Sequence, residues 1–177
     1  NYGTTTIEGG TFTSVHTTVI NHGTMTIDGG TFTCNGLEGI TAHALLADAG
    51  TTTINGGTFN GKDNYNGFNV DASEGATVYI TGGNFLPVHS GSLYGKGTIA
   101  VSGGTFFDEV PEARCAAGYI PQDNDDGTYG VVEDPDYGMV AKIGETRYAT
   151  LAAAFAAAAQ TEELTTIELL PVTIEED

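Results

Sequence analysis

The sequence is poor in several residue types, and each shortage excludes some kinds of partner or architecture. Among 177 residues there is no tryptophan, and there are only two cysteines and only five lysines and arginines, against 23 aspartates and glutamates. The formal net charge of −18 argues against nucleic acid or anionic lipid as a partner, because both are polyanions. Cys34 and Cys115 cannot form a disulfide framework and show no CxxC spacing, so we predict two separate, unpaired thiols.

Long apolar runs are also absent. No stretch approaches the roughly 18 apolar residues of a membrane span, so membrane insertion is not expected. No segment has the features of a signal peptide. The chain begins at Asn1, inside a repeated phrase, which predicts that it is one part of a longer, multi-module chain. Any targeting segment is then expected outside this sequence.

Glycine and one repeated phrase are abundant. There are 26 glycines, and hydrophobic residues make up 40% of the chain, enough for a continuous core. The phrase occurs without gaps as Gly3–Phe12, Gly23–Phe32, Gly50–Phe59, Ala76–Phe85 and Gly97–Phe106. A constant phrase at variable spacing predicts a fixed strand–turn–strand unit joined by loops of changing length.

Alternation within the phrase predicts β-strands. In the second copy Met25 and Ile27 alternate with Thr24 and Thr26, which gives one apolar and one polar face, and a Gly-Gly pair then allows a sharp bend. One unit cannot bury its own apolar face, so the copies should stack like on like. The sequence therefore predicts an all-β fold, a right-handed parallel β-helix of about five coils with about three short strands each, over residues 1–106.

A meander or sandwich is the main alternative to this fold. In it, each Gly-Gly pair would form a hairpin turn. A hairpin does not explain why the same inward residues recur at the same position of every phrase, so we favour the solenoid.

The segment 107–137 differs from the coils and is predicted to be a cap. Residues 108–117 suit a short helix that ends at Gly118, and Asp125–Gly127 suits a hairpin turn between two strands. A cap is needed because an open solenoid end exposes apolar side chains and unpaired strand groups.

The last segment, 138–177, is predicted to be a small α+β, strand–helix–strand element that starts a following module. Thr150 suits the N-cap of an alanine-rich helix over 151–159. Leu151 and Phe155 share one helix face, and we expect this uncharged helix to pack against a neighbouring element. The flanking strands are expected at 139–143 and 165–170.

The phrases resemble those of surface proteins from gut Firmicutes and related anaerobes, which carry tandem "GTLTINGGTF"-like phrases on a pectate-lyase-like right-handed β-helix. The stretch Gly104–Tyr129 is similar to the end-of-helix cap of that family. Ala141–Leu151 is similar to its "IGxxxYATLxxA" element, which opens the next module. The resemblance covers essentially the whole chain. It implies an extracellular location, secreted or at the bacterial cell surface, and it implies no particular ligand.

Enzymatic activity is the main alternative to a structural role. A polysaccharide lyase needs carboxylates that hold Ca²⁺ and a basic residue beside the substrate acid, yet Lys62 and Lys96 lie in loops without an acidic cluster in strand register. A hydrolase needs two converging carboxylates, and the stacked pair Glu8 and Asp28 is the candidate. We predict no catalytic residue and keep a carbohydrate-active β-helix fragment as the alternative.

Metal and cofactor motifs are weak. Asp123–Gly127 matches only a fragment of a Ca²⁺ loop and lacks its later glutamate, so we interpret it as the hairpin turn. The four histidines have irregular spacing and are interpreted as loop or surface residues; they are His16, His22, His43 and His89. We predict no metal site and no cofactor.

The longest insertions, 33–49 and 60–75, are where we expect a partner to bind. The candidate ligand-binding residues are Leu37, Glu38, Asn60, Lys62, Asp63, Asn64 and Tyr65. Tyr65 and Tyr94 are candidates for an aromatic platform for a sugar, with Asn64 and Asn66 as hydrogen-bonding neighbours. The predicted function is a non-catalytic structural or adhesive module that presents loops to a host glycan or host protein.

A minor alternative is ice binding through outward T-x-T pairs. These pairs recur on the first three coils, and the array breaks at Tyr79 and Ala100. Threonine also favours strands for ordinary reasons, which weakens this interpretation.

Overall fold

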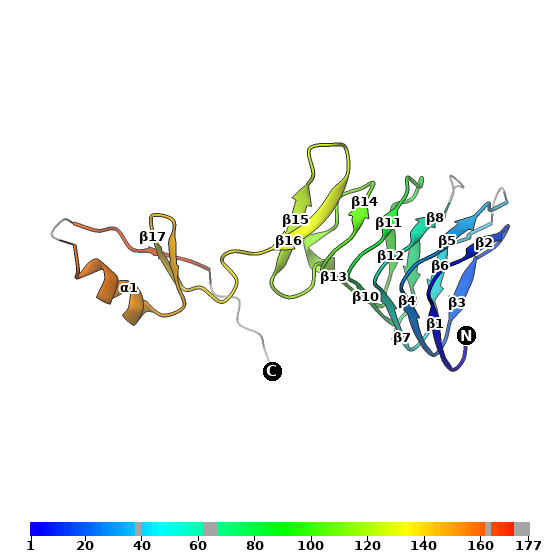
Figure 1. The fold of residues 1–177 in the computed structure, drawn as a ribbon, viewed down its shortest axis with the longest axis horizontal. Helices are drawn as coiled ribbons and strands as arrows, with labels where there is room; N and C mark the ends of the chain where they lie inside the picture. The colour runs from blue at the N-terminus through cyan, green and yellow to red at the C-terminus, as the bar shows by residue number, and fades with distance from the viewer. Residues whose placement is uncertain (38–39, 62–66, 162–163, 172–177) are drawn as a thin grey trace. The chain divides into compact units, whose positions relative to one another are not determined.

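The computed structural model describes residues 1–37, 40–61, 67–161 and 164–171. The chain divides into two compact units, Asn1–Glu133 and Asp134–Asp177, and each is described by itself. The first unit contains the repeated phrases and the cap segment (Figure 1).

Three stacks of short parallel strands build the first unit. Sheet A contains β1 (Thr4–Ile7), β4 (Thr24–Ile27), β7 (Thr51–Ile54), β10 (Thr77–Ile80) and β13 (Thr98–Val101). Sheet B contains β2 (Thr11–Ser14), β5 (Thr31–Cys34), β8 (Thr58–Asn60), β11 (Asn84–Phe85) and β14 (Thr105–Phe106). Sheet C contains β3 (Val19–Asn21), β6 (Leu45–Ala47), β9 (Val70–Ala72) and β12 (Leu93–Gly95). Because the chain visits the sheets in turn and each strand pairs in parallel with its counterpart in the next coil, the predicted parallel β-helix is confirmed (Figure 1).

The core is a set of like-on-like stacks. The phenylalanine that ends each phrase stacks on the next, with ring centroids 5.0 Å apart between Phe32 and Phe59 and 4.4 Å apart between Phe85 and Phe106. Ile27 and Ile54 pair in register and are fully buried beside them. Burying each such side chain contributes about 1.5–3 kcal/mol, so the repeated phrase supplies the main stabilising term.

The Gly-Gly bend has a steric basis at both positions. A Cβ on Gly82 would lie only 2.4 Å from the carbonyl oxygen of Asn55 in the preceding coil. The second glycine of the pair, Gly83, has a φ of +110°, which L side chains rarely adopt. The first glycine is therefore required for close stacking and the second for the turn.

The C-terminal end of the solenoid is covered strand by strand. The hairpin predicted around Asp125–Gly127 is confirmed, with β15 (Tyr119–Asp123) antiparallel to β16 (Tyr129–Glu133). Strand β16 also pairs with β14 and so extends sheet B. The cap thus belongs to the same compact unit as the coils, which ends at Glu133.

The helix predicted over 108–117 is wrong apart from one short turn, η1 (Glu112–Arg114). Proline at 111 and the extended backbone of Cys115 bound this turn, and Cys115 bridges Val101 in parallel. Arg114 instead donates hydrogen bonds to the carbonyl oxygens of Gly95 (2.6 Å), the last residue of β12, and of Gly97 (3.1 Å), just before β13. The segment is extended because it caps strand edges, a tertiary demand that overrides local helix propensity.

The second unit is a small sheet with one helix. It contains β17 (Ala141–Ile143), β18 (Thr146–Tyr148), α1 (Leu151–Ala158) and β19 (Glu168–Leu169). The predicted N-cap of the helix is confirmed, since Thr150 Oγ1 accepts a hydrogen bond from the Ala153 amide at 3.2 Å. The helix packs against β17 and β18, as expected for an uncharged helix, but Leu151 and Phe155 are 42% and 61% exposed. The helix buries Ala154 instead, because the small residue permits close approach to the sheet.

Candidate functional site

The outer faces of sheets A and C differ sharply in chemistry. On sheet A the pairs Thr4/Thr6, Thr24/Thr26 and Thr51/Thr53 lie in register, as predicted from the phrase. On sheet C the residues at one register position are Ile20, Leu46, Asp71 and Tyr94. Four coils therefore place four different side chains on the outer face of sheet C, which makes this face the candidate site.

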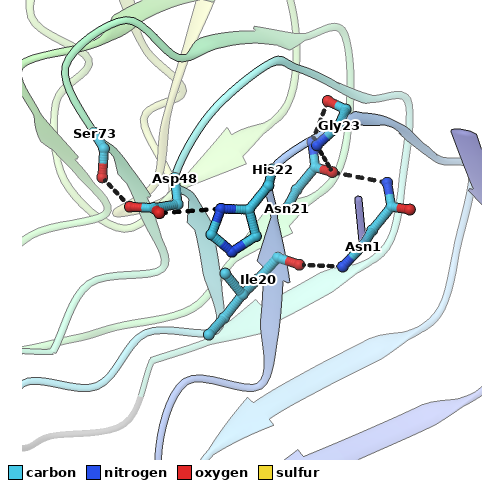
Figure 2. Close-up of polar contacts among 7 residues, drawn as sticks. All are labelled: Asn1, Ile20, Asn21, His22, Gly23, Asp48 and Ser73. Carbon is cyan, nitrogen blue, oxygen red and sulfur yellow. Dashed lines mark hydrogen bonds and ion pairs between the residues drawn. The ribbon is translucent and has the colours of Figure 1, made fainter. Parts of the chain in front are cut away.

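A polar ladder, defined as Tyr2, His22, Asp48 and Ser73, borders this face where sheet C turns towards sheet A. Tyr2 stacks on His22 with ring centroids 4.4 Å apart, and His22 Nδ1 lies 3.1 Å from Asp48 Oδ2. Ser73 Oγ donates to the other oxygen of Asp48 at 2.9 Å (Figure 2). The serine bonds to the carboxylate rather than to the imidazole, so the set does not form the nucleophile–base pair of a hydrolase.

A buried asparagine fixes the corner beneath this ladder. The side chain of Asn21 is fully buried and donates to Thr52 Oγ1 at 2.9 Å and to the Gly23 carbonyl at 3.0 Å. Its Oδ1 accepts from the Gly23 amide at 3.0 Å and from Asn1 Nδ2 at 2.8 Å (Figure 2). These bonds satisfy the amide and hold the turn into the next phrase in one geometry.

His43 and Asp71 form a buried pair on sheet C. His43 is 4% exposed, and its Nε2 lies 3.2 Å from Asp71 Oδ2. Burial lowers the pKa of His43 despite the nearby carboxylate, and burial also raises the pKa of Asp71. His43 Nδ1 is buried without a hydrogen-bond partner in the described part of the chain, which further favours a neutral ring. His43 lies in a loop before β6, as predicted for the histidines, but it is buried rather than at the surface.

Aromatic rings connect this pair to the surface. His43 stacks on Phe68 with centroids 5.7 Å apart, and Phe68 stacks on Tyr94 at 4.2 Å with an interplanar angle of 8°. Tyr94 is 53% exposed and stands next to Asp71 in strand register. The stack therefore runs from a buried imidazole to an exposed phenol ring, with a partly buried carboxylate beside it.

Gly95 makes room for that carboxylate. A Cβ at this position would lie 2.0 Å from the Ala72 carbonyl oxygen and 2.7 Å from Asp71 Oδ1. Its φ of +113° is also a conformation that L side chains rarely adopt. The glycine directly after Tyr94 is thus part of the local geometry of the site, and the repeated phrase gives no signal for it because Gly95 lies between two phrases.

Most of the predicted ligand-binding residues lie outside the part of the chain that the structure describes. Glu38, Lys62, Asp63, Asn64 and Tyr65, together with Asn66, lie outside the described residues. Leu37 is 47% exposed in the segment after β5, and Asn60 ends β8 half-buried in register with Thr33. The structure thus places these two in different segments, and neither is in strand register with Tyr94.

The base of the insertion 60–75 lies directly beside the aromatic stack. The Gly61 amide donates to Asn69 Oδ1 at 2.8 Å, and a Cβ on Gly61 would lie 2.3 Å from the Phe68 carbonyl oxygen. Asn69 is fully buried and also donates to the Leu86 carbonyl at 2.8 Å. The two ends of this insertion are therefore held together next to Phe68.

The acid pair considered for hydrolysis lies on a different face. Asp28 accepts a hydrogen bond from Asn55 Nδ2 at 2.8 Å, and Asn55 Oδ1 accepts from Thr81 Oγ1 at 2.8 Å. Glu8 lies one coil away, at the end of β1, and is exposed. The arrangement is a ladder of side-chain hydrogen bonds along the coils. Of the two carboxylates, that of Asp28 accepts a hydrogen bond in this ladder.

In the acidic turn 123–127, carboxylates accept hydrogen bonds from nearby backbone amides. Asp123 Oδ1 accepts from the Asp125 amide at 2.9 Å, and Asp126 Oδ1 accepts from the Thr128 amide at 3.0 Å. Hydrogen bonds from the Thr128 hydroxyl and the Thr128 amide lower the pKa of Asp126. Within the described ranges, no three His, Cys, Asp or Glu side chains are grouped so that they could hold a metal ion.

Both cysteines are unpaired, as predicted. Cys34 is buried and its Sγ donates to the His16 carbonyl at 2.7 Å, while burial raises the pKa of both thiols. A raised pKa favours the unreactive thiol form, so neither residue has the character of a nucleophile.

In the part of the chain that the structure describes, no helix has the length and apolar character needed to cross a membrane. Comparisons with protein-family models, with curated protein sequences and with solved structures find no significant match to this chain.

Proposed function

We propose that this chain is a non-catalytic structural and adhesive module of a secreted or cell-surface bacterial protein, and that it binds a host glycan or host protein through the outer face of sheet C and the adjoining loops. The observation that carries the proposal is the half-exposed Tyr94, held on Phe68 in a face where every coil contributes a different residue. A purely structural face has no need of such variation.

The solenoid presents these side chains in a fixed geometry. Each strand of sheet C pairs with its neighbour residue for residue, and the core beneath it contains Leu45 and Val70, both fully buried. Side chains held on packed strands lose little conformational freedom on binding, which favours affinity. The face therefore suits recognition by preorganised contacts.

Charge limits the range of partners. With a net charge of −18, the chain repels polyanions and attracts basic proteins at long range. A neutral glycan avoids the repulsion and binds through aromatic and hydrogen-bonding contacts. Both partner classes agree with the composition, whereas nucleic acid does not.

A carbohydrate-active fragment is the second candidate, because Glu8 and Asp28 stand on neighbouring coils. The test is a binding screen of the purified chain against host glycans, mucins and serum proteins, with release of reducing sugars and unsaturated uronides measured in the same wells. The proposal predicts saturable binding without product. Product release that Glu8→Gln and Asp28→Asn abolish would show an enzyme, and the absence of both binding and product would leave a spacer.

A further inference from the structure

We infer that Tyr94, Phe68 and Asp71 form a subsite for one pyranose ring of a neutral glycan. This inference rests on the proposed binding function and assigns it to one place and one ligand chemistry. It is carried by the combination of a stacked, exposed aromatic ring with a neighbouring carboxylate on adjacent strands.

The aromatic part of the subsite is positioned in advance. Phe68 holds the ring of Tyr94 at 4.2 Å in a nearly parallel stack, while 53% of Tyr94 remains exposed. The negative face of an aromatic ring attracts the polarised C–H groups on one face of a sugar. Since Tyr94 is already ordered by Phe68, stacking a sugar on it costs little side-chain entropy.

The polar part of the subsite is Asp71. One of its oxygens, Oδ2, faces His43 Nε2 at 3.2 Å, and the other, Oδ1, lies over Gly95, immediately after Tyr94 in the chain. Its side chain is 17% exposed, so the carboxylate is fixed but still reachable. A fixed carboxylate is a strong acceptor for sugar hydroxyl groups, which donate hydrogen bonds to it.

Charge selects a neutral ligand over an anionic one. Burial raises the pKa of Asp71, and repulsion from the Asp48 carboxylate raises it further, so negative charge is already unfavourable around Asp71. A sialic acid, uronic acid or sulfate group would add a third negative charge to a chain of net charge −18. The subsite therefore fits uncharged hexoses and N-acetylhexosamines.

Another exposed tyrosine provides a matched control. Tyr79 is 47% exposed and points outward from β10 on sheet A, in register with Thr53 and Ala100. Among the described residues, Tyr79 has neither the stacked partner nor the neighbouring carboxylate of Tyr94. A ligand that needs only an exposed phenol would use either residue, whereas the subsite predicts that only Tyr94 matters.

The test is binding of the full chain to immobilised lacto-N-tetraose, a neutral tetrasaccharide, to its sialylated counterpart, and to other neutral and anionic glycan pairs on one array. We expect the neutral member of a pair to bind better. Tyr94→Ala should weaken binding about ten-fold or more, Tyr94→Phe should retain it, and Tyr79→Ala should leave it unchanged. Asp71→Asn should also weaken binding, because it removes a charged acceptor.

Preference for the anionic members, equal binding by Tyr94→Ala and wild type, or no glycan binding at all would each overturn the subsite. The proposed function is judged separately, because binding to serum proteins or mucin protein that persists without any glycan binding would keep the adhesive role and remove only this inference. Circular dichroism of each variant establishes that a lost signal does not come from unfolding.

Discussion

The outer faces of sheets A and C lie on the same solenoid, yet they follow opposite patterns. Sheet A repeats threonine in register over its first three coils, whereas sheet C changes residue at every coil from Ile20 to Tyr94. Beneath both faces the inward side chains are apolar and fully buried, with Ile27 and Ile54 under sheet A and Leu45 and Val70 under sheet C. The comparison teaches that the stack constrains the buried inward positions, while the outer face of sheet C varies from coil to coil and is available for recognition.

The largest expected effect comes from the core that both faces share. Phe59→Ala removes a fully buried ring stacked between Phe32 and Phe85, and we expect the free energy of unfolding to fall by about 3–5 kcal/mol. Urea denaturation followed by circular dichroism measures it. A loss below about 1 kcal/mol would mean that the phenylalanine stack is not the main support of the two faces.

A second substitution tests the backbone geometry of sheet C alone. Gly95→Ala forces a Cβ to 2.0 Å from the Ala72 backbone at a positive φ, so we expect a loss of about 2 kcal/mol or more, together with weaker glycan binding. Gly9→Ala is the control, because nothing lies within 4 Å of its Cβ. Equal unfolding midpoints for the two variants would contradict the steric role assigned to Gly95.

The buried pair on sheet C should make stability depend on pH. Burial lowers the pKa of His43 below its ordinary 6.5, so the unfolded chain gains a proton there before the folded chain does, and stability falls as the pH drops through about 6.5. The raised pKa of Asp71 acts in the opposite direction: its contribution favours the folded chain as the pH falls towards 3.8.

Unfolding of wild type, His43→Gln and Asp71→Asn between pH 7.5 and pH 4 resolves the two contributions. His43→Gln should flatten the fall near pH 6.5, and Asp71→Asn should remove the opposing rise at lower pH. If the curve of His43→Gln runs parallel to that of wild type across the upper part of this range, the imidazole is not buried as described.

The smallest expected effect lies on the repetitive face. Thr53→Ala should change the free energy of unfolding by no more than about 0.5 kcal/mol and should leave glycan binding unchanged, because the side chain lies on the outer face of sheet A, between Thr26 and Tyr79. A binding loss comparable to that of Tyr94→Ala would place the contact surface on sheet A and contradict the distinction drawn between the two faces.

The sequence predicted the coils well because the periodicity of strand, turn and core residues can be read directly from the repeated phrase. Alternation of Met25 and Ile27 with threonine, the Gly-Gly bend and the recurring phenylalanine determine strand, turn and core, and the structure follows them. The segment 108–117 was mispredicted because its extended backbone depends on strand edges that are far away in the sequence. The sequence did not indicate which face of α1 packs against the sheet, and the unit buries Ala154 rather than the larger Leu151 and Phe155.

The site was less accessible to sequence reasoning. The sequence indicated Tyr94 as part of a sugar platform together with Tyr65, whereas its partner Phe68 and the pair of His43 and Asp71 were not foreseen. These residues lie in the variable stretches between phrases, where spacing differs from coil to coil and no repeat aligns them. Only the register of β6, β9 and β12 brings them together.

The most direct test of the proposed binding face is a titration of the isotopically labelled chain with lacto-N-tetraose, followed by backbone amide chemical shifts in NMR. The account predicts that the perturbed amides cluster on β9 and β12 around Asp71, Tyr94 and Gly95, while those of β1, β4 and β7 stay unchanged. Shifts that map to the threonine pairs of sheet A, or to the ladder around Asp28 and Asn55, would contradict it.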